Sequence, residues 1–82
     1  MKKVLVYSTP TCPYCARVKD YLSENGVRYD EVDISSDQKN LDEMVKKSKQ
    51  MGIPVIDFNG RIVIGFEKEA IDEAIKEAAL NE

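Results

Sequence analysis

The order of hydrophobic and polar positions along the chain predicts a short strand followed by an amphipathic helix. Residues 4–7, Val-Leu-Val-Tyr, form an uninterrupted apolar run of the kind found in buried strands. From Pro13 to about Glu24, apolar side chains recur every three or four residues, which is the period of a helix. Asn25-Gly26 ends this pattern, because glycine adopts the left-handed conformation that terminates many helices.

The middle of the chain predicts a second strand and a lightly anchored helix. Residues 27–34 alternate imperfectly between apolar and charged side chains, which indicates a half-exposed strand at a sheet edge. Residues 35–38 then supply several N-cap candidates, including a Ser-x-x-Gln capping box. The helix that follows has a thin apolar face made of Leu41, Met44 and Val45. We interpret the lysines near its C-terminal end, where the helix dipole favours cations, as solvent-exposed: Lys46, Lys47 and Lys49.

The remaining residues predict a hairpin and a final helix. Two apolar runs, residues 53–58 and 61–64, are joined by Asn59-Gly60, one of the strongest short hairpin signals. Gly65-Phe66 then turns the chain into a helix from about Glu67 to Leu80. The apolar face of this helix consists of Ala70, Ile71, Ala74, Ile75 and Ala78.

The resulting order of elements, βαβαββα, predicts an α/β fold. A helix joins the first two strands, so they are expected to be parallel with a right-handed crossover. The last two strands form an antiparallel hairpin. Together these features predict a four-stranded mixed sheet in the order 2-1-3-4, with helices on both faces. A sheet covered on both sides explains why the first, third and fourth strands are nearly all apolar.

Length and composition limit the function classes. A chain of 82 residues forms one domain, residues 1–82, with one core. Its net charge of −3 gives no electrostatic reason to expect nucleic acid as a partner. No apolar run has the length that spans a bilayer, and the start of the chain does not resemble a secretory signal. We therefore expect a cytoplasmic monomer that binds neither nucleic acid nor membrane.

The chemistry concentrates in one stretch, Thr11-Cys12-Pro13-Tyr14-Cys15, between the first strand and the first helix. A C-x-x-C motif at this position is typical of a dithiol–disulfide redox site. A helix N-terminus carries partial positive charge and unpaired N–H groups, both of which favour a thiolate. Residues three apart lie on the same face of a helix, so Cys12 and Cys15 can join in a disulfide.

Two other readings of the cysteine pair are weaker. A disulfide that closes so short a loop would restrict the unfolded chain little, so a purely structural bridge gains little stability. A structural zinc site needs four ligands, and the chain has two cysteines and no histidine. No zinc site within one chain is therefore possible, and we expect no metal.

With Cys-Pro-Tyr-Cys after the first strand, Ile53-Pro54 before the third and Gly65-Phe66 before the last helix, the chain resembles the glutaredoxins, which have the thioredoxin fold. The resemblance extends over the whole chain. It implies that Cys12 is the exposed nucleophile and that Cys15 is the buried resolving cysteine. It also implies that glutathione is the co-substrate and that glutathionylated or disulfide-containing proteins are the partners.

The same resemblance implies which residues bind glutathione. Pro54 matches the family's cis-proline, which presents the main chain of Ile53 to the cysteinyl part of glutathione or to a substrate peptide. In the family, the γ-glutamyl carboxylate of glutathione binds at a helix N-terminus, where backbone N–H groups suit an anion. Residues 65–68, at the start of the last helix, would occupy that segment here. The implied glutathione-binding residues are Tyr14, Ile53, Pro54, Gly65, Phe66, Glu67 and Lys68.

Three positions depart from the family pattern. Thr9 stands where many glutaredoxins have a lysine, Gly52-Ile53-Pro54 replaces Thr-Val-Pro, and Phe66-Glu67-Lys68 replaces a segment that often holds two aspartates. The Gly65-Phe66 turn is similar to that of glutaredoxin-like electron donors of ribonucleotide reductase, which use thioredoxin reductase. The resemblance thus leaves both reductants open for this enzyme. An iron–sulfur cluster carrier, bridging two chains through Cys12, is the weaker alternative, because proline after the nucleophile stiffens the loop.

Overall fold

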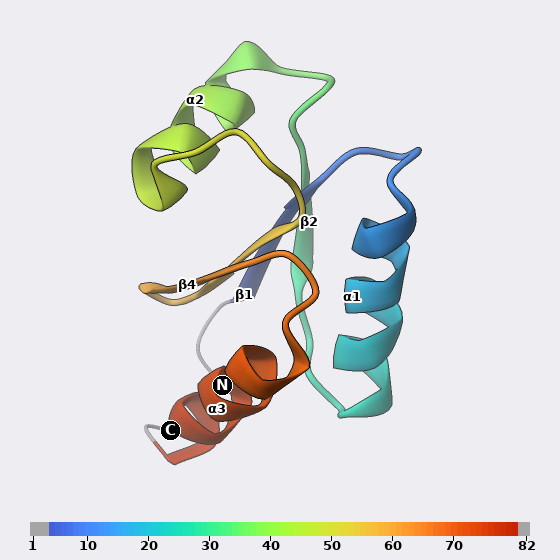
Figure 1. The fold of residues 1–82 in the computed structure, drawn as a ribbon, viewed down its shortest axis with the longest axis vertical. Helices are drawn as coiled ribbons and strands as arrows, with labels where there is room; N and C mark the ends of the chain where they lie inside the picture. Colours follow the sequence, from blue (N-terminus) through green and yellow to red (C-terminus); the bar gives the residue numbers. More distant parts are fainter. Residues whose placement is uncertain (1–3, 81–82) are drawn as a thin grey trace.

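The computed structural model describes residues 4–80, and it describes side chains up to residue 77, so the predicted core position Ala78 lies outside the described side chains. The predicted order βαβαββα is confirmed within this range (Figure 1). The elements are β1 (Val4–Ser8), α1 (Pro13–Glu24), β2 (Asp30–Asp33), α2 (Gln38–Ser48), β3 (Val55–Phe58), β4 (Arg61–Ile64) and α3 (Lys68–Leu80).

The four strands form one sheet in the predicted order β2-β1-β3-β4. β1 is parallel to β2 and antiparallel to β3, and β3 is antiparallel to β4. Register places Tyr7 beside Val32 on one side and Val55 on the other, while Val55 also pairs with Ile64. The carboxyl ends of β1, β2 and β4 and the amino end of β3 therefore meet at the same end of the sheet.

The hydrophobic core has two parts because helices cover both faces of the sheet, as predicted (Figure 1). On one face, α1 and α3 pack against the sheet around Val18, Leu22 and Ile71, all 0% exposed. On the other face, α2 is held by Met44, which packs with Tyr7 and Val55. Met44 is the only fully buried side chain of α2, which fits the thin apolar face expected of this helix.

Three boundaries differ from the sequence prediction. β2 is limited to Asp30–Asp33, β3 begins at Val55 rather than at Ile53, and α3 begins at Lys68 rather than at Glu67. β4 is also less buried than an enclosed strand, with Ile64 44% exposed. The reason is that β4, like β2, lies at an edge of the four-stranded sheet that the described residues form.

The hairpin turn has the conformation that its sequence predicts, whereas the N-terminus of α2 is capped differently from the prediction. Asn59 and Gly60 both have positive φ, 53° and 114°, as a two-residue hairpin turn requires. The capping box proposed for residues 35–38 does not form, because Asp37 caps α2 by accepting a hydrogen bond from the N–H of Lys39. The Ser35 hydroxyl instead donates to Asp33, in the turn that leaves β2.

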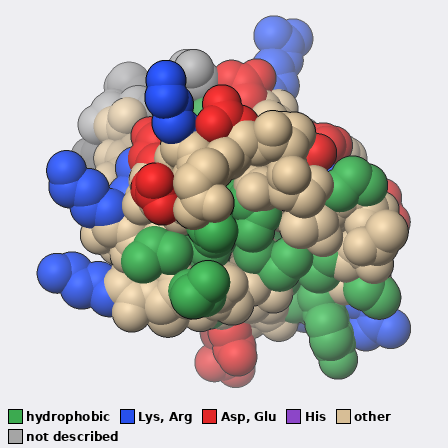
Figure 2. Space-filling view, turned by 90° about the horizontal axis from the view of Figure 1, so that it is seen from above, with side chains coloured by type: hydrophobic (Ala, Val, Ile, Leu, Met, Phe, Trp, Pro, Cys, Tyr) green, Lys and Arg blue, Asp and Glu red, His purple; other side chains and the backbone are tan. Residues whose placement is uncertain are grey.

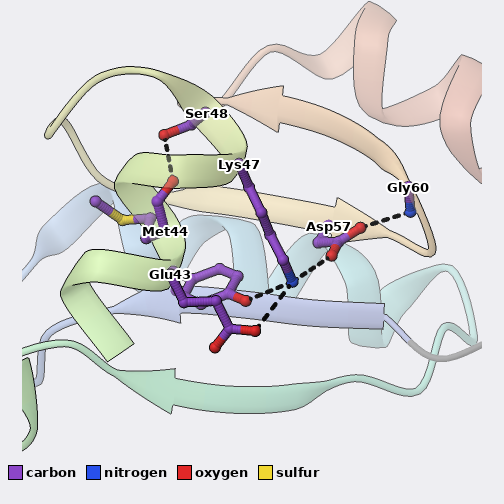
Figure 3. Close-up of polar contacts among 7 residues, drawn as sticks. Glu43, Met44, Lys47, Ser48, Asp57 and Gly60 are labelled. Atoms are coloured by element: carbon purple, nitrogen blue, oxygen red, sulfur yellow. Dashed lines mark hydrogen bonds and ion pairs between the residues drawn. The ribbon is translucent and has the colours of Figure 1, made fainter. Parts of the chain in front are cut away.

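Lys47 is not the solvent-exposed lysine that the sequence suggested. Its side chain is 28% exposed and crosses from α2 to the sheet, where its ammonium donates to Asp57 and to the hydroxyl of Tyr7 (Figure 3). Asp57 is 7% exposed and also accepts from the N–H of Gly60 in the hairpin turn. Burial alone would lower the pKa of Lys47, but the hydrogen bonds to Asp57 and Tyr7 outweigh it and raise the pKa.

Candidate functional site

The cysteine motif lies at the end of the sheet where three connecting segments meet. Residues 9–12 leave β1 there, residues 49–54 enter β3, and residues 65–67 leave β4. The N-terminus of α1 borders this end, and residues 49–54 cross back to it from the last turn of α2 (Figure 1). The fold therefore brings together most of the residues that the sequence singled out, although they are more than fifty positions apart.

Cys12 occupies the N-cap of α1, with Pro13 at the first helical position. Its backbone is extended, at φ −85° and ψ 116°, and its side chain is half-buried. The Sγ atom accepts a hydrogen bond from the backbone N–H of Cys15 at 3.3 Å. An N–H donor and the positive end of a helix both favour negative charge on this sulfur. Cys12 is thus reachable from solvent, with its sulfur at the N-terminus of the helix.

The surroundings of Cys15 differ from those of Cys12, chiefly in burial. It is 0% exposed and lies one turn into α1. Burial raises the pKa of its thiol to about 11, and the contact with Cys12 adds to the rise. Both cysteines are free thiols in this structure. The Cys15 thiol therefore stays protonated at neutral pH.

Tyr14 and Arg17 form the exposed rim of the motif. The Tyr14 side chain is 57% exposed, and the guanidinium carbon of Arg17 lies 5.4 Å from its ring centre. Such a cation–π contact limits the positions that the ring adopts beside the cysteines. Lys19, one turn further along the helix, forms an ion pair with Glu31 on β2 at 3.4 Å.

Ile53 and Pro54 lie at the entrance to β3, and the peptide bond between them is cis, as the family resemblance implies. The carbonyl of Pro54 accepts a hydrogen bond of 2.7 Å from the N–H of Gly65. This bond joins the segment before β3 to the segment after β4. Among the described residues, the main chain of Ile53 has no hydrogen-bond partner, so its N–H and C=O are available to a ligand.

The segment from Gly65 to Lys68 connects β4 to α3. Gly65 has φ 77°, and Phe66 packs its ring against Tyr21 of α1 in a T-shaped arrangement with centroids 5.8 Å apart. Glu67 and Lys68 are exposed, and the Lys68 ammonium lies 5.4 Å from the Tyr21 ring centre. Phe66 is thus part of the packing between α1 and this segment, in addition to the ligand role that the resemblance implies.

This end of the molecule also carries apolar surface. Among the described residues, the exposed large hydrophobic side chains are Tyr14, Met51 and Ile64, and Met51 is the most exposed at 69%. Figure 2, which views the molecule from above, shows hydrophobic side chains gathered across this face, with lysines and arginines projecting at its margin. Met51 stands in a stretch without hydrophobic periodicity, so no pattern in the sequence singles it out.

Gln50 is one of three residues, with Lys49 and Lys68, that could compensate for the family lysine replaced by Thr9. Its side-chain amide binds both backbone groups of Gly52, so it is occupied within the protein. Thr9, which stands at the family's lysine position, supplies its backbone carbonyl to the N–H of Cys12 at 3.4 Å. The amide of Gln50 is thus already bonded within the protein, and Thr9 has no charge to offer a ligand carboxylate.

The sequence is similar to known glutaredoxins and glutaredoxin-like proteins. The family model described as glutaredoxin matches residues 4–63. A glutaredoxin-like 8.6 kDa protein encoded in the rubredoxin operon of Clostridium pasteurianum is 42% identical over 73 residues, which cover 89% of this chain and 97% of that protein. Glutaredoxin 3 of Escherichia coli strain K12 is 39% identical over 56 residues, 68% of each chain.

Solved structures agree with the sequence comparison. The crystal structure of a glutaredoxin from Archaeoglobus fulgidus superposes with a TM-score of 0.85 at 27% identity, over 93% of this chain and 88% of that one. The four-stranded sheet in the order β2-β1-β3-β4 with three helices is therefore the thioredoxin fold, as predicted. None of the helices within residues 4–80 has the length and apolar character needed to cross a membrane.

Proposed function

This chain belongs to the glutaredoxin family of thiol–disulfide oxidoreductases, and from that premise we propose that it reduces protein disulfides and protein–glutathione mixed disulfides with electrons from glutathione. The observation that carries the proposal is the division of labour between the two thiols. Cys12 is reachable, caps α1 and receives an N–H hydrogen bond, whereas Cys15 is buried and held protonated.

The proposed reaction with a protein disulfide has two steps. The Cys12 thiolate attacks one sulfur of the substrate, a new S–S bond forms, and the other substrate sulfur leaves as a thiolate. Cys15 then loses its proton and attacks Cys12, which releases the second substrate thiol and leaves a Cys12–Cys15 disulfide. Two molecules of glutathione restore the dithiol and become glutathione disulfide. The substrate gains two electrons and two protons, and glutathione supplies both.

A protein–glutathione mixed disulfide needs only Cys12. The thiolate takes the glutathionyl group and releases the protein thiol, and a second glutathione then attacks that group to form glutathione disulfide. For the bound glutathionyl group, we assign the residues implied by the family resemblance. Ile53 supplies main-chain groups beside Pro54, Tyr14 flanks the group, and the turn residues Gly65, Phe66, Glu67 and Lys68 face its γ-glutamyl end.

A second candidate reductant is thioredoxin reductase. It is favoured by the occupied amide of Gln50 and by Thr9 at the lysine position, because both reduce the number of side chains available to the carboxylates of glutathione. The exposed carboxylate of Glu67, next to the first turn of α3, also favours thioredoxin reductase, because its negative charge repels the carboxylates of glutathione. In this alternative, the same dithiol takes electrons from another protein rather than from glutathione.

One experiment separates the two reductants. The consumption of NADPH is followed with hydroxyethyl disulfide as substrate, in one reaction with glutathione and glutathione reductase and in another with thioredoxin reductase alone. We expect turnover in the first and loss of it in the Cys12→Ser variant. Turnover only in the second reaction would replace glutathione by thioredoxin reductase as the electron source. A Cys12→Ser variant that remained active would contradict the dithiol mechanism itself.

A further inference from the structure

We propose that Gln50 is a positioning residue that holds the segment before Pro54 in the conformation that receives a peptide substrate; this inference rests on the proposed function. The side-chain amide of Gln50 makes two hydrogen bonds to the backbone of one residue, Gly52. Oε1 accepts from the Gly52 N–H at 2.6 Å, and Nε2 donates to the Gly52 carbonyl at 2.9 Å. We call this pair of bonds the Gln50–Gly52 contact.

The Gln50–Gly52 contact fixes both polar groups of one residue directly before Ile53. An amide side chain has one acceptor and one donor side, and each here meets its complement on Gly52. This is the pattern by which neighbouring antiparallel strands hold one another. The direction of the main chain into Ile53 is therefore set by the side chain of Gln50, three residues earlier. This segment has no strand partner of its own.

The contact is itself tied to the core of the protein. Ser48, the last residue of α2, places its hydroxyl oxygen 2.7 Å from the Met44 carbonyl and 3.0 Å from the Gln50 carbonyl. Nε2 of Gln50 also lies 3.2 Å from this hydroxyl. Met44 is fully buried against the sheet. A continuous series of contacts thus runs from the packed face of α2 through Gln50 to the residue that precedes Ile53.

The same contact favours a residue without a Cβ atom at position 52, where the family pattern has threonine. A Cβ atom on Gly52 would lie 2.7 Å from Oε1 of Gln50, closer than such atoms approach one another. Gly52 is not in the left-handed region, so its backbone accepts other residues and the restriction comes from Gln50 alone. Glycine at residue 52 therefore suits the Gln50–Gly52 contact, and a side chain there would have to displace the amide of Gln50.

The consequence for substrate binding follows from the free main chain of Ile53. A peptide that carries a disulfide would pair with these backbone groups while its sulfur meets Cys12. If the Gln50–Gly52 contact is lost, the segment gains conformational freedom that binding must then remove. A small disulfide without peptide groups makes no such pairing, so its reaction with Cys12 does not depend on the segment.

The test measures single-turnover oxidation of the reduced protein by two disulfides, a disulfide-bridged peptide and hydroxyethyl disulfide. In Gln50→Ala we expect the apparent second-order rate constant for the peptide to fall about tenfold, the equivalent of one or two hydrogen bonds, and the rate for hydroxyethyl disulfide to stay within about twofold. The pH profile of Cys12 alkylation by iodoacetamide should not move. The matched control is Gln38→Ala, whose amide binds only Asp42 on the exposed side of α2.

A second variant makes the test independent of any general loss of structure. Gly52→Ala alone should slow the peptide reaction as Gln50→Ala does, because the added methyl group displaces Oε1. In the Gln50→Ala background the same Gly52→Ala change should cost less than about twofold further, since the obstructing atom is gone. Equal slowing of both disulfides in Gln50→Ala, or additive losses in the double variant, would overturn the positioning role. Wild-type protein that reacted with neither disulfide would instead overturn the proposed function, and this inference with it.

Discussion

The ammonium of Lys47 lies 2.8 Å from a carboxylate oxygen of Asp57, and this pair joins α2 to the centre of the sheet. The same ammonium donates to Tyr7 on the neighbouring strand at 2.8 Å and lies 3.5 Å from Glu43 one helical turn earlier. Since α2 buries only Met44 completely, the pair supplies an attachment that its thin apolar face does not. It lies on the face of the sheet opposite α1, so its effect is on stability rather than on the cysteines.

Replacing Lys47 with methionine should therefore destabilise the protein. The change keeps most of the apolar part of the side chain but leaves the Asp57 carboxylate, 7% exposed, without its cation. We expect the free energy of unfolding to fall by about 2 kcal/mol, measured by urea denaturation. Lys46→Met, at an exposed position of the same helix, is the control and should change it by less than about 0.5 kcal/mol. Equal losses in both variants would show that the Lys47–Asp57 pair contributes nothing specific.

The sequence predicted best what is decided by neighbouring residues. Three local features were predicted and are confirmed by the structure: the Asn59-Gly60 turn, the left-handed Gly26 and the helix start at Pro13. That Cys12 is exposed and Cys15 buried was implied by the family resemblance, and the structure agrees on the exposure of both side chains. The family resemblance added the cis bond before Pro54, which composition and periodicity do not reveal.

What the sequence did not predict depends on contacts between distant segments. Lys47 looks like any lysine at the end of a helix until Asp57, on a strand ten residues later, is brought beneath it. The role of Gln50 depends on a bend of the chain that no pattern of apolar residues records. The capping box failed for a similar reason, since Ser35 is used by the turn after β2 and Asp37 is the better placed acceptor.

The difference between the two thiols should appear in their reaction with iodoacetamide. At pH 7, the reduced protein should be modified at Cys12 and not at Cys15, because Cys15 is buried and its pKa is raised to about 11. Mass spectrometry of peptides after a timed reaction measures both sites. Denaturant should abolish the selectivity, which gives the control. Comparable modification of the two cysteines in the folded protein would contradict the assignment of their roles.

The raised pKa of Cys15 also predicts a pH dependence of stability. The unfolded thiol ionises near 9.0, whereas the folded one remains protonated up to about 11. Its contribution to stability is thus fully present below pH 9.0 and is lost as the pH rises to about 11. Other groups titrate in this range, so the measurement is the difference between the wild type and Cys15→Ala, both reduced. A difference in unfolding free energy that stayed constant from pH 8 to pH 11 would be the contrary result.

Removal of the second thiol should separate the two proposed reactions. Cys15→Ser leaves Cys12 and its helix N-terminus in place, so reduction of a glutathionylated peptide should continue at a rate comparable to that of the wild type. Reduction of a protein disulfide should stop after one substrate molecule is joined to Cys12, because no thiol remains to release it. Trapping of that mixed disulfide on a non-reducing gel is the measurement. Continued turnover of protein disulfides by Cys15→Ser would show that an external thiol resolves the intermediate.

Gly65 offers a test of how the turn after β4 supports the site. Its φ of 77° disfavours any residue with a Cβ, so Gly65→Ala should cost about 1 kcal/mol in unfolding free energy. Gly26 is a matched control, with φ 71° and equally open surroundings, but it ends α1 far from the cysteines in the sequence and at the other end of the helix. The two alanine variants should therefore lose similar stability.

Their activities should differ, because only Gly65 is bonded to the segment that carries Pro54. The Gly65 N–H donates to the Pro54 carbonyl at 2.7 Å, and a shift in the turn would move that carbonyl together with the main chain of Ile53. We expect Gly65→Ala to raise the KM for a peptide disulfide about tenfold with little change in kcat, and Gly26→Ala to leave both constants within about twofold. If both variants lost activity in proportion to their stability, the turn would act only through folding, and its role at the site would have to be abandoned.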